Sequence, residues 1–448
     1  MRVLEQILNL LEDKKAVFLT GGGGVGKSYL TRQIIADFTS SKQSVVALGS
    51  TGISAVNIGG VTVHSFFKFG ISNDINQLAA LDKKQGARLK ELYEIIKKTD
   101  LLIIDEISMV SSDLFEMIAY RLRAGHFSGA LLLVGDFYQL APVQKGVNAL
   151  NGNQNSNFTS NNALFAPTNI YAFSSYAWSS INPQNVLLTH SKRTDDLHFY
   201  SLLNELRQGI LSKECYEFLC SRLINEHNKA PKDALMLFGV NRKADTINKE
   251  RLNMLNAPLY SIEAKIEVLD KSLSEQALLK WIANLSLPEV LELKVGAEVM
   301  FCANKRGSFY NGERGVVIDI SDELISVAKK DGSIVDVAQV SFELNEYISD
   351  GDDVLSVQRA SFSQFPLRLA YAITIHKSQG MSIDEFICDI DDIFARGQLY
   401  VALSRATSAQ GLFLHFSGAN LLSHLRRSVA CDDAVRAFYE NNNFIKES

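Results

Sequence analysis

Eight residues near the start of the chain, GGGGVGKS at 21–28, have the types and spacing of a phosphate-binding loop. Glycines let the backbone fold so that successive N–H groups converge on a phosphate, and a helix starting nearby adds its positive end. A lysine there can reach the β- and γ-phosphates, and a serine hydroxyl can hold Mg²⁺. The pattern predicts a nucleoside triphosphate site formed by Gly22, Gly23, Gly24, Val25, Gly26, Lys27, Ser28 and Tyr29.

Two more stretches place polar side chains at the ends of apolar runs. In LLIIDE (101–106), Asp105 is expected to bind Mg²⁺ and Glu106 to polarise the attacking water. The alternative is an acidic strand exit without a function. In GDFYQLAPV (135–143), Gln139 offers an amide that can bond to the nucleotide or to the water. The alternative for Gln139 is a surface position.

The elements that would position these groups belong to an α/β protein. Over the first 140 residues, short apolar strands alternate with helical patterns, which predicts a parallel, doubly wound sheet. A second α/β unit is expected from about residue 186, with a helical stretch at 421–440 near its end. Between its parts, residues 290–360 read as short alternating strands and predict an inserted all-β module. The Asn- and Ser-rich segment 149–163 predicts a long surface loop.

The bulk properties exclude several classes of protein. The chain has 448 residues, 46% apolar, and no apolar run long enough to span a bilayer. Its first residues resemble neither a signal peptide nor a transit peptide, so we expect a cytoplasmic protein. Five cysteines without a CxxC pair argue against zinc and against a disulfide framework. The formal charge of −5 does not by itself indicate a nucleic-acid partner. It does not exclude one, because a local basic channel would be enough to bind a nucleic acid.

Further segments resemble the motifs of the Pif-type (petite integration frequency) helicases of superfamily 1. TGISAVNIGGVTVHSF (51–66) is similar to one of them, and GDFYQLAPV to the third motif of that family. The segments THSKRTDD (189–196), YAITIHKSQGMSID (371–384) and QLYVALSRATS (398–408) follow in the family's order. The resemblance extends from about residue 16 to 442. A related helicase of the RecD or phage Dda type is the alternative, which the TGISAVNIGG stretch disfavours.

The resemblance implies an ATP-driven DNA helicase that moves 5′ to 3′ on a single strand. It implies two RecA-like domains, a small wedge and an SH3-like β module. We place the first domain at 1–66 and 86–185, the wedge at 67–85, the second domain at 186–258 and 360–448, and the β module at 259–359. The expected cofactors are ATP and Mg²⁺. The expected partners are single-stranded and forked DNA, with G-quadruplex DNA as a further candidate, and the expected processes are DNA repair, recombination, replication and telomere maintenance.

The resemblance also assigns residues. Arg193 and Arg405 would reach across the cleft to the γ-phosphate, and Gly380 would join the nucleotide site. DNA contacts would come from Thr51, Gly52, His64, Phe66, His376 and Lys377. Alternatives remain for several of these: a surface position for Arg193, core packing for Phe66, and a structural role for His376. Lys305, Arg306, Phe309 and Tyr310 suggest a strand contact, for which a solvated hairpin tip is the alternative.

Two features depart from the family pattern. The family reads adenine with a glutamine upstream of the phosphate loop, and the candidate here, Gln6, lies about two residues closer to the loop than expected. The chain has no long N-terminal extension, which favours a bacterial or phage-like helicase core, expected to be a monomer. An ATP-switched DNA clamp that does not unwind remains the alternative to a translocating helicase.

Overall fold

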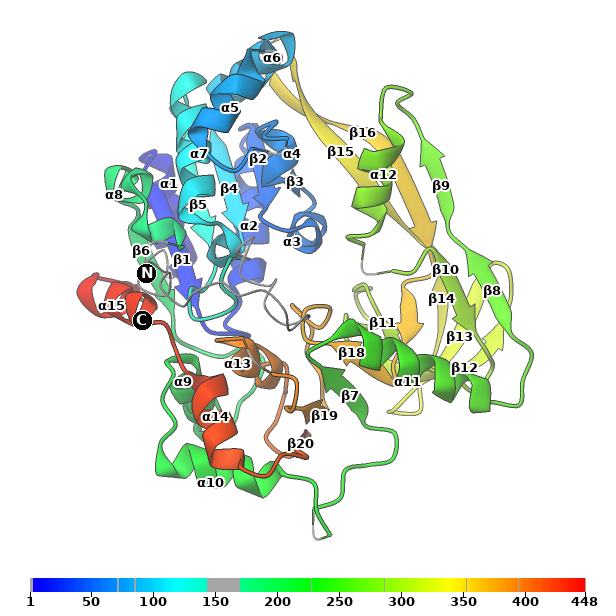
Figure 1. The fold of residues 1–448 in the computed structure, drawn as a ribbon. Coiled ribbons are helices and arrows are strands. Elements are labelled where there is room, and N and C mark those ends of the chain that lie inside the picture. Colours follow the sequence, from blue (N-terminus) through cyan, green and yellow to red (C-terminus); the bar gives the residue numbers. More distant parts are fainter. Residues whose placement is uncertain are drawn as a thin grey trace, which may run out of the picture.

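The computed structural model describes residues 3–142 and 170–447, except positions 71, 84–85, 227, 286, 352 and 394. These ranges form two α/β domains and a β module (Figure 1). The segment 149–163, predicted as a surface loop, lies outside the described residues. No helix in these ranges combines the length and the apolar character needed to cross a membrane.

The first domain is built on a sheet of seven parallel strands. They are β1 (Ala16–Gly21), β2 (Val45–Gly49), β3 (Val61–Thr62), β4 (Leu101–Asp105), β5 (Ala130–Val134), β6 (Gln184–Leu188) and β21 (Ile445–Lys446). Their order in the sheet is β21-β6-β1-β5-β4-β2-β3. Every residue of β4 and β5 is buried, as expected for parallel strands covered on both faces. The predicted doubly wound sheet is confirmed.

Helices cover both faces of this sheet. They are α1 (Val3–Glu12), α2 (Lys27–Ser40), α6 (Gly86–Lys98), α7 (Ser112–Ala124), α8 (Tyr176–Ile181) and α15 (Asp433–Asn441), with the shorter α3 (Gly52–Asn57), α4 (Val63–Phe66), α5 (Ile75–Asp82), η1 (Ile107–Met109) and η4 (Ala172–Ser174). Successive residues of β1 point to opposite faces. Val17 and Leu19 pack with α1 and α2, whereas Phe18 packs with α7, α8 and α15.

The expected wedge, 67–85, contains helix α5. Asp82 at the end of α5 accepts two hydrogen bonds from the guanidinium of Arg121 on α7, each 2.6 Å long. Arg121 is fully buried and also donates to the carbonyl oxygen of Phe67 at 3.1 Å. Both ends of the described part of this segment are therefore hydrogen-bonded to Arg121 of α7. Its role in separating strands stays a prediction.

The second domain has a sheet of four parallel strands in the order β18-β7-β19-β20. The strands are β7 (Leu235–Phe238), β18 (Ala372–Thr374), β19 (Phe386–Asp389) and β20 (Leu412–His415). The helices are α9 (Leu197–Arg207), α10 (Lys213–Arg222), α11 (Asn241–Met254), α13 (Gln398–Leu403) and α14 (Leu421–Val429). Asp196 caps α9 by accepting from the N–H of Phe199, which fixes where that helix begins. The second α/β unit is confirmed.

The β module is antiparallel and lies to one side of the two domains (Figure 1). It contains β8 (Tyr260–Glu263), β9 (Lys265–Val268), α12 (Glu275–Ile282), β10 (Val290–Leu293), β11 (Glu298–Phe301), β12 (Arg314–Ile320), β13 (Leu324–Lys329), β14 (Ile334–Ala338), β15 (Val340–Asp350), β16 (Asp353–Gln364) and β17 (Leu367–Leu369). Strands β14-β13-β12-β11-β17 form its main sheet. The long hairpin β15–β16 reaches the first domain, where the Tyr347 hydroxyl accepts from the N–H of Ala47 at 3.0 Å.

Two expected domain boundaries and one expected helix are wrong in detail. Strand β6 pairs with β1, so the second domain does not begin at residue 186. The β module does not end at 359, because β16 spans that position and β17 pairs with β11. The expected helix at 421–440 is two helices, and α15 packs on the first domain beside β6 (Figure 1).

Candidate active site

The loop between β1 and α2 has the backbone of a phosphate cradle. Gly24 and Gly26 have φ values of 80° and 96°, which side chains disfavour. Helix α2 begins at Lys27, so the N–H groups of its first turn face the loop. The Lys27 ammonium donates to the carbonyl oxygens of Gly21 and Gly22 at 2.8 and 3.0 Å. The Lys27 ammonium therefore lies against the first two residues of the loop.

Side chains from beyond the first domain close directly on this loop. The Tyr400 hydroxyl of α13 accepts a hydrogen bond from the N–H of Gly23 at 2.6 Å. A Cβ added at Gly23 would lie 2.8 Å from Ser404 Oγ, and one added at Gly24 would lie 2.7 Å from Arg193 Cβ. Only glycine fits between the two domains at these positions, so the loop forms one wall of an interdomain site.

Two arginines from across the cleft meet at this wall. Arg193 donates to Ser382 Oγ at 3.0 Å and to the carbonyl oxygen of Ser404. Arg405 donates to the carbonyl oxygen of Val401 at 2.9 Å and to Ser404 Oγ at 3.1 Å. In the described part of the chain neither guanidinium forms an ion pair with a carboxylate. The charge of Glu106 acts on Arg405, but neither arginine forms a salt bridge with it, and two cations side by side make a site that attracts a highly charged anion.

Burial of the two guanidinium groups makes the binding of an anion beside them more favourable. It lowers the pKa of Arg193 to about 9, and the charge of Arg405 adds to this effect. Burial also lowers the pKa of Arg405. The surface alternative for Arg193 is therefore wrong, because the side chain lies against the loop at Gly24 rather than in solvent.

The two acidic residues at the end of β4 lie on the same edge of the sheet. Burial, together with the charge of Glu106, raises the pKa of Asp105 to about 7. Burial likewise raises the pKa of Glu106. Glu106 adopts a left-handed backbone with φ 54°, and its carbonyl oxygen accepts from Ser50 Oγ at 2.8 Å. Its Oε1 accepts from Gln379 Nε2 at 3.0 Å.

The donor set fits Mg²⁺. Ser28 offers an exposed hydroxyl in the first turn of α2, and Asp105 offers a carboxylate that is 8% exposed. Both are hard oxygen donors, which Mg²⁺ prefers. A divalent cation would favour the ionised form of Asp105, which burial disfavours.

Gln139 is 7% exposed, so the surface alternative is wrong for it. Its Nε2 donates to Asp136 Oδ2 at 3.3 Å. Asp136 also forms two bonds with Arg207 of α9, at 2.9 and 2.8 Å, and accepts from the Tyr439 hydroxyl at 3.3 Å. Although burial alone would raise the pKa of Asp136, the Arg207 guanidinium holds it below its usual value. Gln139 is thus held at the interface by an interdomain ion pair.

The expected DNA contacts divide into two groups. Thr51 caps α3 by accepting from Ser54 N at 3.1 Å, and a Cβ added at Gly52 would lie 2.2 Å from Asn284 Cβ. His64 is exposed, with its ring 6.0 Å from that of Phe69. The other group is the turn after β18, where the side chains of His376 and Lys377 are exposed.

Phe66 is not available to stack on a base. It is 4% exposed and packs edge-on against Phe67 and Tyr347, with ring centroids 4.9 and 5.9 Å apart. Phe309 is buried in the same way, stacked on Phe301 at 4.3 Å. The contacts expected of Phe66 and Phe309 are wrong, because these rings belong to the hydrophobic cores of the first domain and of the β module. The third aromatic residue, Tyr310, is 41% exposed and donates to Asp384 Oδ2 at 3.1 Å, so its strand contact stays a prediction.

The remaining predicted positions surround the loop or lie apart from it. Val25 is buried in the core with α1 and α2, whereas Tyr29 is 65% exposed. Gly380 has φ 82° and open space around it, so it ends the turn that carries Gln379. Gln6 lies on α1, and its amide oxygen is buried without a hydrogen-bond partner in the described residues.

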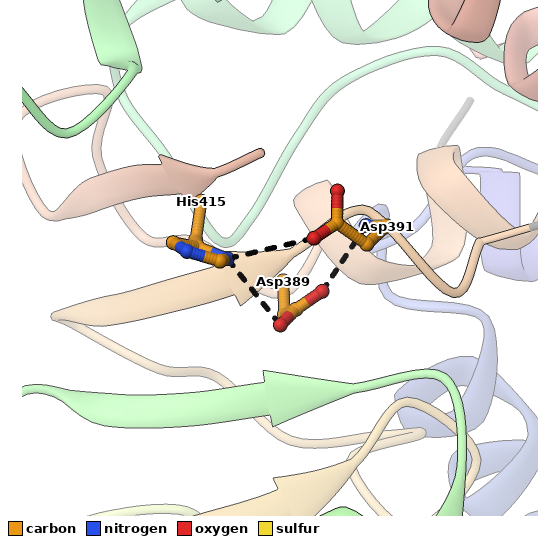
Figure 2. A group of neighbouring side chains, drawn as sticks. All are labelled: Asp389, Asp391 and His415. Carbon is orange, nitrogen blue, oxygen red and sulfur yellow. Dashed lines mark hydrogen bonds and ion pairs between the residues drawn. The ribbon is translucent and has the colours of Figure 1, made fainter. Parts of the chain in front are cut away.

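A second group of polar side chains lies at the ends of β19 and β20. Figure 2 shows Asp389, Asp391 and His415 around one point, with His415 Nδ1 3.4 Å from Asp389 Oδ2 and 4.0 Å from Asp391 Oδ2. Within the described chain these groups already have partners: Asp391 accepts from Ser417, and Lys243 lies 3.9 Å from Asp389. The neighbouring ammonium disfavours a bound cation, so we read this cluster as structural.

The chain is similar to known helicases over nearly its whole length. Residues 1–215 match the family described as PIF1-like helicase. The ATP-dependent DNA helicase Pif1 of Campylobacter jejuni is 42% identical over 439 residues, which cover 96% of this chain and 95% of that protein. The chain belongs to the Pif1-like helicase family.

Solved structures of Pif1 agree with this assignment. The crystal structure of Bacteroides sp Pif1 in complex with ADP-AlF4 is 26% identical, with a TM-score of 0.80, and the match covers 98% of this chain and 96% of that one. Bacteroides Pif1 bound to ssDNA is 25% identical, with a TM-score of 0.60, over 98% and 95% of the two chains. The Pif1-like chain therefore shares the fold with two RecA-like domains.

The geometry of this Pif1-like chain adds residues that sequence reasoning missed. They are Asp136, Arg207, Tyr400, Tyr439 and Gln379. Asp136, Tyr400 and Gln379 lie inside segments that resemble family motifs, so the segments were found but these members were not assigned roles. For Arg207 the available signal was weak: an arginine in the last turn of an amphipathic helix reads as a solvated residue.

The buried pair of Asp136 and Arg207 is expected to contribute strongly to the stability of this Pif1-like chain. Replacing Arg207 with Ala should lower the stability by about 3–5 kcal/mol, because the Asp136 carboxylate then stays buried without its cation. Urea unfolding followed by circular dichroism measures the change. Lys213→Ala, which breaks the exposed pair with Glu217 at 3.7 Å, is the control, with an expected loss below about 0.5 kcal/mol. Equal midpoints for the two variants would contradict the prediction.

Proposed function

We propose that this chain is an ATP-dependent DNA helicase that moves 5′ to 3′ on a single strand and unwinds duplex DNA. The observation that carries the proposal is the pair Arg193 and Arg405. Arg193 lies against Gly24 of the phosphate loop, and Arg405 donates to Ser404, whose side chain lies against Gly23. Among the described residues neither arginine forms a salt bridge, although the charge of Glu106 acts on Arg405. A triphosphate bound at the loop would supply the missing negative charge and hold the two domains together.

The proposed roles follow from the positions of the groups. The loop amides and Lys27 would bind the phosphates, and Ser28 and Asp105 would hold Mg²⁺, which neutralises charge on the phosphate oxygens. Glu106 would polarise the attacking water, and Gln139 would sense the γ-phosphate. Arg405 and Arg193 would stabilise the negative charge that develops in the transition state. Hydrolysis would then require a closed cleft, and product release would let it open.

Adenine is the proposed base of the nucleotide. The buried amide oxygen of Gln6 lacks a donor in the described part of the chain, and the amino group of adenine would supply one. The spacing to the phosphate loop differs from the family pattern. A comparison of ATP with GTP as the substrate would test this reading.

The proposed DNA path runs past Thr51, Gly52 and His64 in the first domain and past His376 and Lys377 in the second. Lys377 offers an exposed ammonium to a backbone phosphate. The proposed substrates are single-stranded and forked DNA, with G-quadruplex DNA as a further candidate. The proposed setting is DNA repair, recombination, replication or telomere maintenance by a monomer in a bacterial cytoplasm. The relative from Campylobacter jejuni supports the bacterial part of this setting.

Strand displacement on tailed duplexes tests the activity and its direction together. We expect the chain to release a labelled strand from a duplex with a 5′ single-stranded tail, in the presence of ATP and Mg²⁺, and not from one with a 3′ tail. DNA-stimulated hydrolysis without strand release would favour a clamp instead. A hydrolysis rate that single-stranded DNA leaves unchanged would contradict both readings.

A further inference from the structure

One hydrogen bond joins the proposed DNA turn to the proposed catalytic carboxylate. Gln379 Nε2 donates to Glu106 Oε1 at 3.0 Å. The two residues are 273 positions apart and belong to different RecA-like domains. The bond therefore exists only while the two domains are closed on each other across the cleft.

The backbone of Glu106 is fixed from its own side of the cleft. Its carbonyl oxygen accepts from Ser50 Oγ at 2.8 Å and from the N–H of Met109 at 3.0 Å. With φ at 54°, the residue is held in a conformation that a glutamate adopts only under constraint. The main chain is thus set by the first domain, whereas the carboxylate receives a hydrogen bond from the second.

The turn that carries Gln379 is closed by its own hydrogen bonds. Ser378 is fully buried, its N–H donates to the carbonyl oxygen of Thr374 at 3.0 Å, and its hydroxyl donates to that of Ile375 at 2.8 Å. The N–H of Gln379 donates to the carbonyl oxygen of His376 at 3.3 Å. His376 and Lys377 stand exposed on the same turn. A displacement of the backbone at these two residues would therefore also displace Gln379.

We propose that Gln379 is a positioning residue that makes the orientation of Glu106 depend on DNA bound at the turn of His376 and Lys377. The inference rests on the proposed helicase function. A phosphate drawn to Lys377 would set the turn, and the Gln379 amide would hold the carboxylate of Glu106 toward the water that attacks the γ-phosphate. Gln379 itself would touch neither the nucleotide nor the strand.

The variant Gln379→Met keeps the length and shape of the side chain and removes its donor. We expect kcat for ATP hydrolysis at saturating single-stranded DNA to fall by about 10–100-fold, since a small misplacement of a reacting group has an effect of that size. The KM for ATP and the Kd for single-stranded DNA, measured by fluorescence anisotropy, should stay within about threefold of wild type. Gln276→Met, at an exposed site on α12, is the matched control and should leave all three quantities unchanged.

A double-mutant cycle separates positioning from a merely structural role. In a Glu106→Gln background, Gln379→Met should have no further effect on kcat, because the carboxylate that it orients is gone. Three results would each overturn the inference. They are DNA-stimulated ATP hydrolysis by Gln379→Met at the wild-type rate, a loss confined to its affinity for DNA or ATP, and additive losses of kcat in the cycle. If wild type itself shows no stimulation by DNA, the proposed function fails instead, so the two failures are distinguishable.

Discussion

Replacing Arg405 with Ala is expected to lower kcat for DNA-stimulated ATP hydrolysis by about 10³–10⁵-fold, the range seen when an arginine that stabilises phosphoryl transfer is lost. The side chain is 3% exposed, donates to Ser404 beside the phosphate loop, and forms no salt bridge in the described chain, with the charge of Glu106 acting on it. Its charge is therefore available for the transition state, where negative charge on the γ-phosphoryl group is greatest. Steady-state kinetics with a phosphate-release assay would measure the change.

The controls for Arg405 separate chemistry from folding. Arg405→Lys keeps one charge but loses the planar fork, so it should recover only a small part of the activity. Arg426→Ala removes an exposed arginine of α14 and should leave kcat unchanged. ATP binding by Arg405→Ala should persist in a nucleotide-binding assay. A variant that loses ATP binding but turns over bound ATP normally would contradict the assigned role.

Replacing Lys27 with Ala is expected to lower ATP hydrolysis by at least about 10²–10³-fold, the loss found when one preorganised donor to transition-state charge is removed. In the structure the ammonium spans the loop by donating to Gly21 and Gly22. With a triphosphate bound, the same group can reach the β- and γ-phosphates. Single-turnover hydrolysis with radiolabelled ATP measures so low a rate.

The fold of the Lys27 variant should remain intact. The loop is shaped by its glycines and by the start of α2, both of which the substitution leaves in place. Circular dichroism and the melting temperature should match wild type within a few degrees. Lys90→Ala on the exposed side of α6 is the control for loss of a positive charge. Turnover of the Lys27 variant at the rate of this control would refute the assigned site.

Local pattern was enough to predict the first half of the candidate site. Lys27 follows a glycine-rich turn, Asp105 ends a fully buried strand and Glu106 follows it, so sequence neighbours alone indicate where these groups lie. Phe66 shows the limit of such reasoning. A phenylalanine beside a polar motif can face either a strand of DNA or the core, and only its contacts with Phe67 and Tyr347 decide.

The second half of the site depends on contacts between distant segments. Asp136 and Arg207 are 71 positions apart, and Gly23 and Tyr400 are 377 apart. No periodicity in a single chain encodes such pairs, because the sequence around each residue does not say which distant residue it contacts. The boundary at 186 was misplaced for a similar reason. An apolar run predicts a strand, but not which of two sheets it joins.

The return of α15 and β21 to the first domain changes how the two RecA-like domains can move. In the described part of the chain, the backbone passes between them at 189–196 and again at 430–432, between α14 and α15. Two domains joined by one chain segment can rotate about any axis through it. Two domains joined at two points rotate most easily about the line that joins those points. Two covalent crossings therefore restrict the relative motion of the domains more than one would. The motion that they hinder least is a rotation about the line joining them, which would open and close the cleft at the phosphate loop.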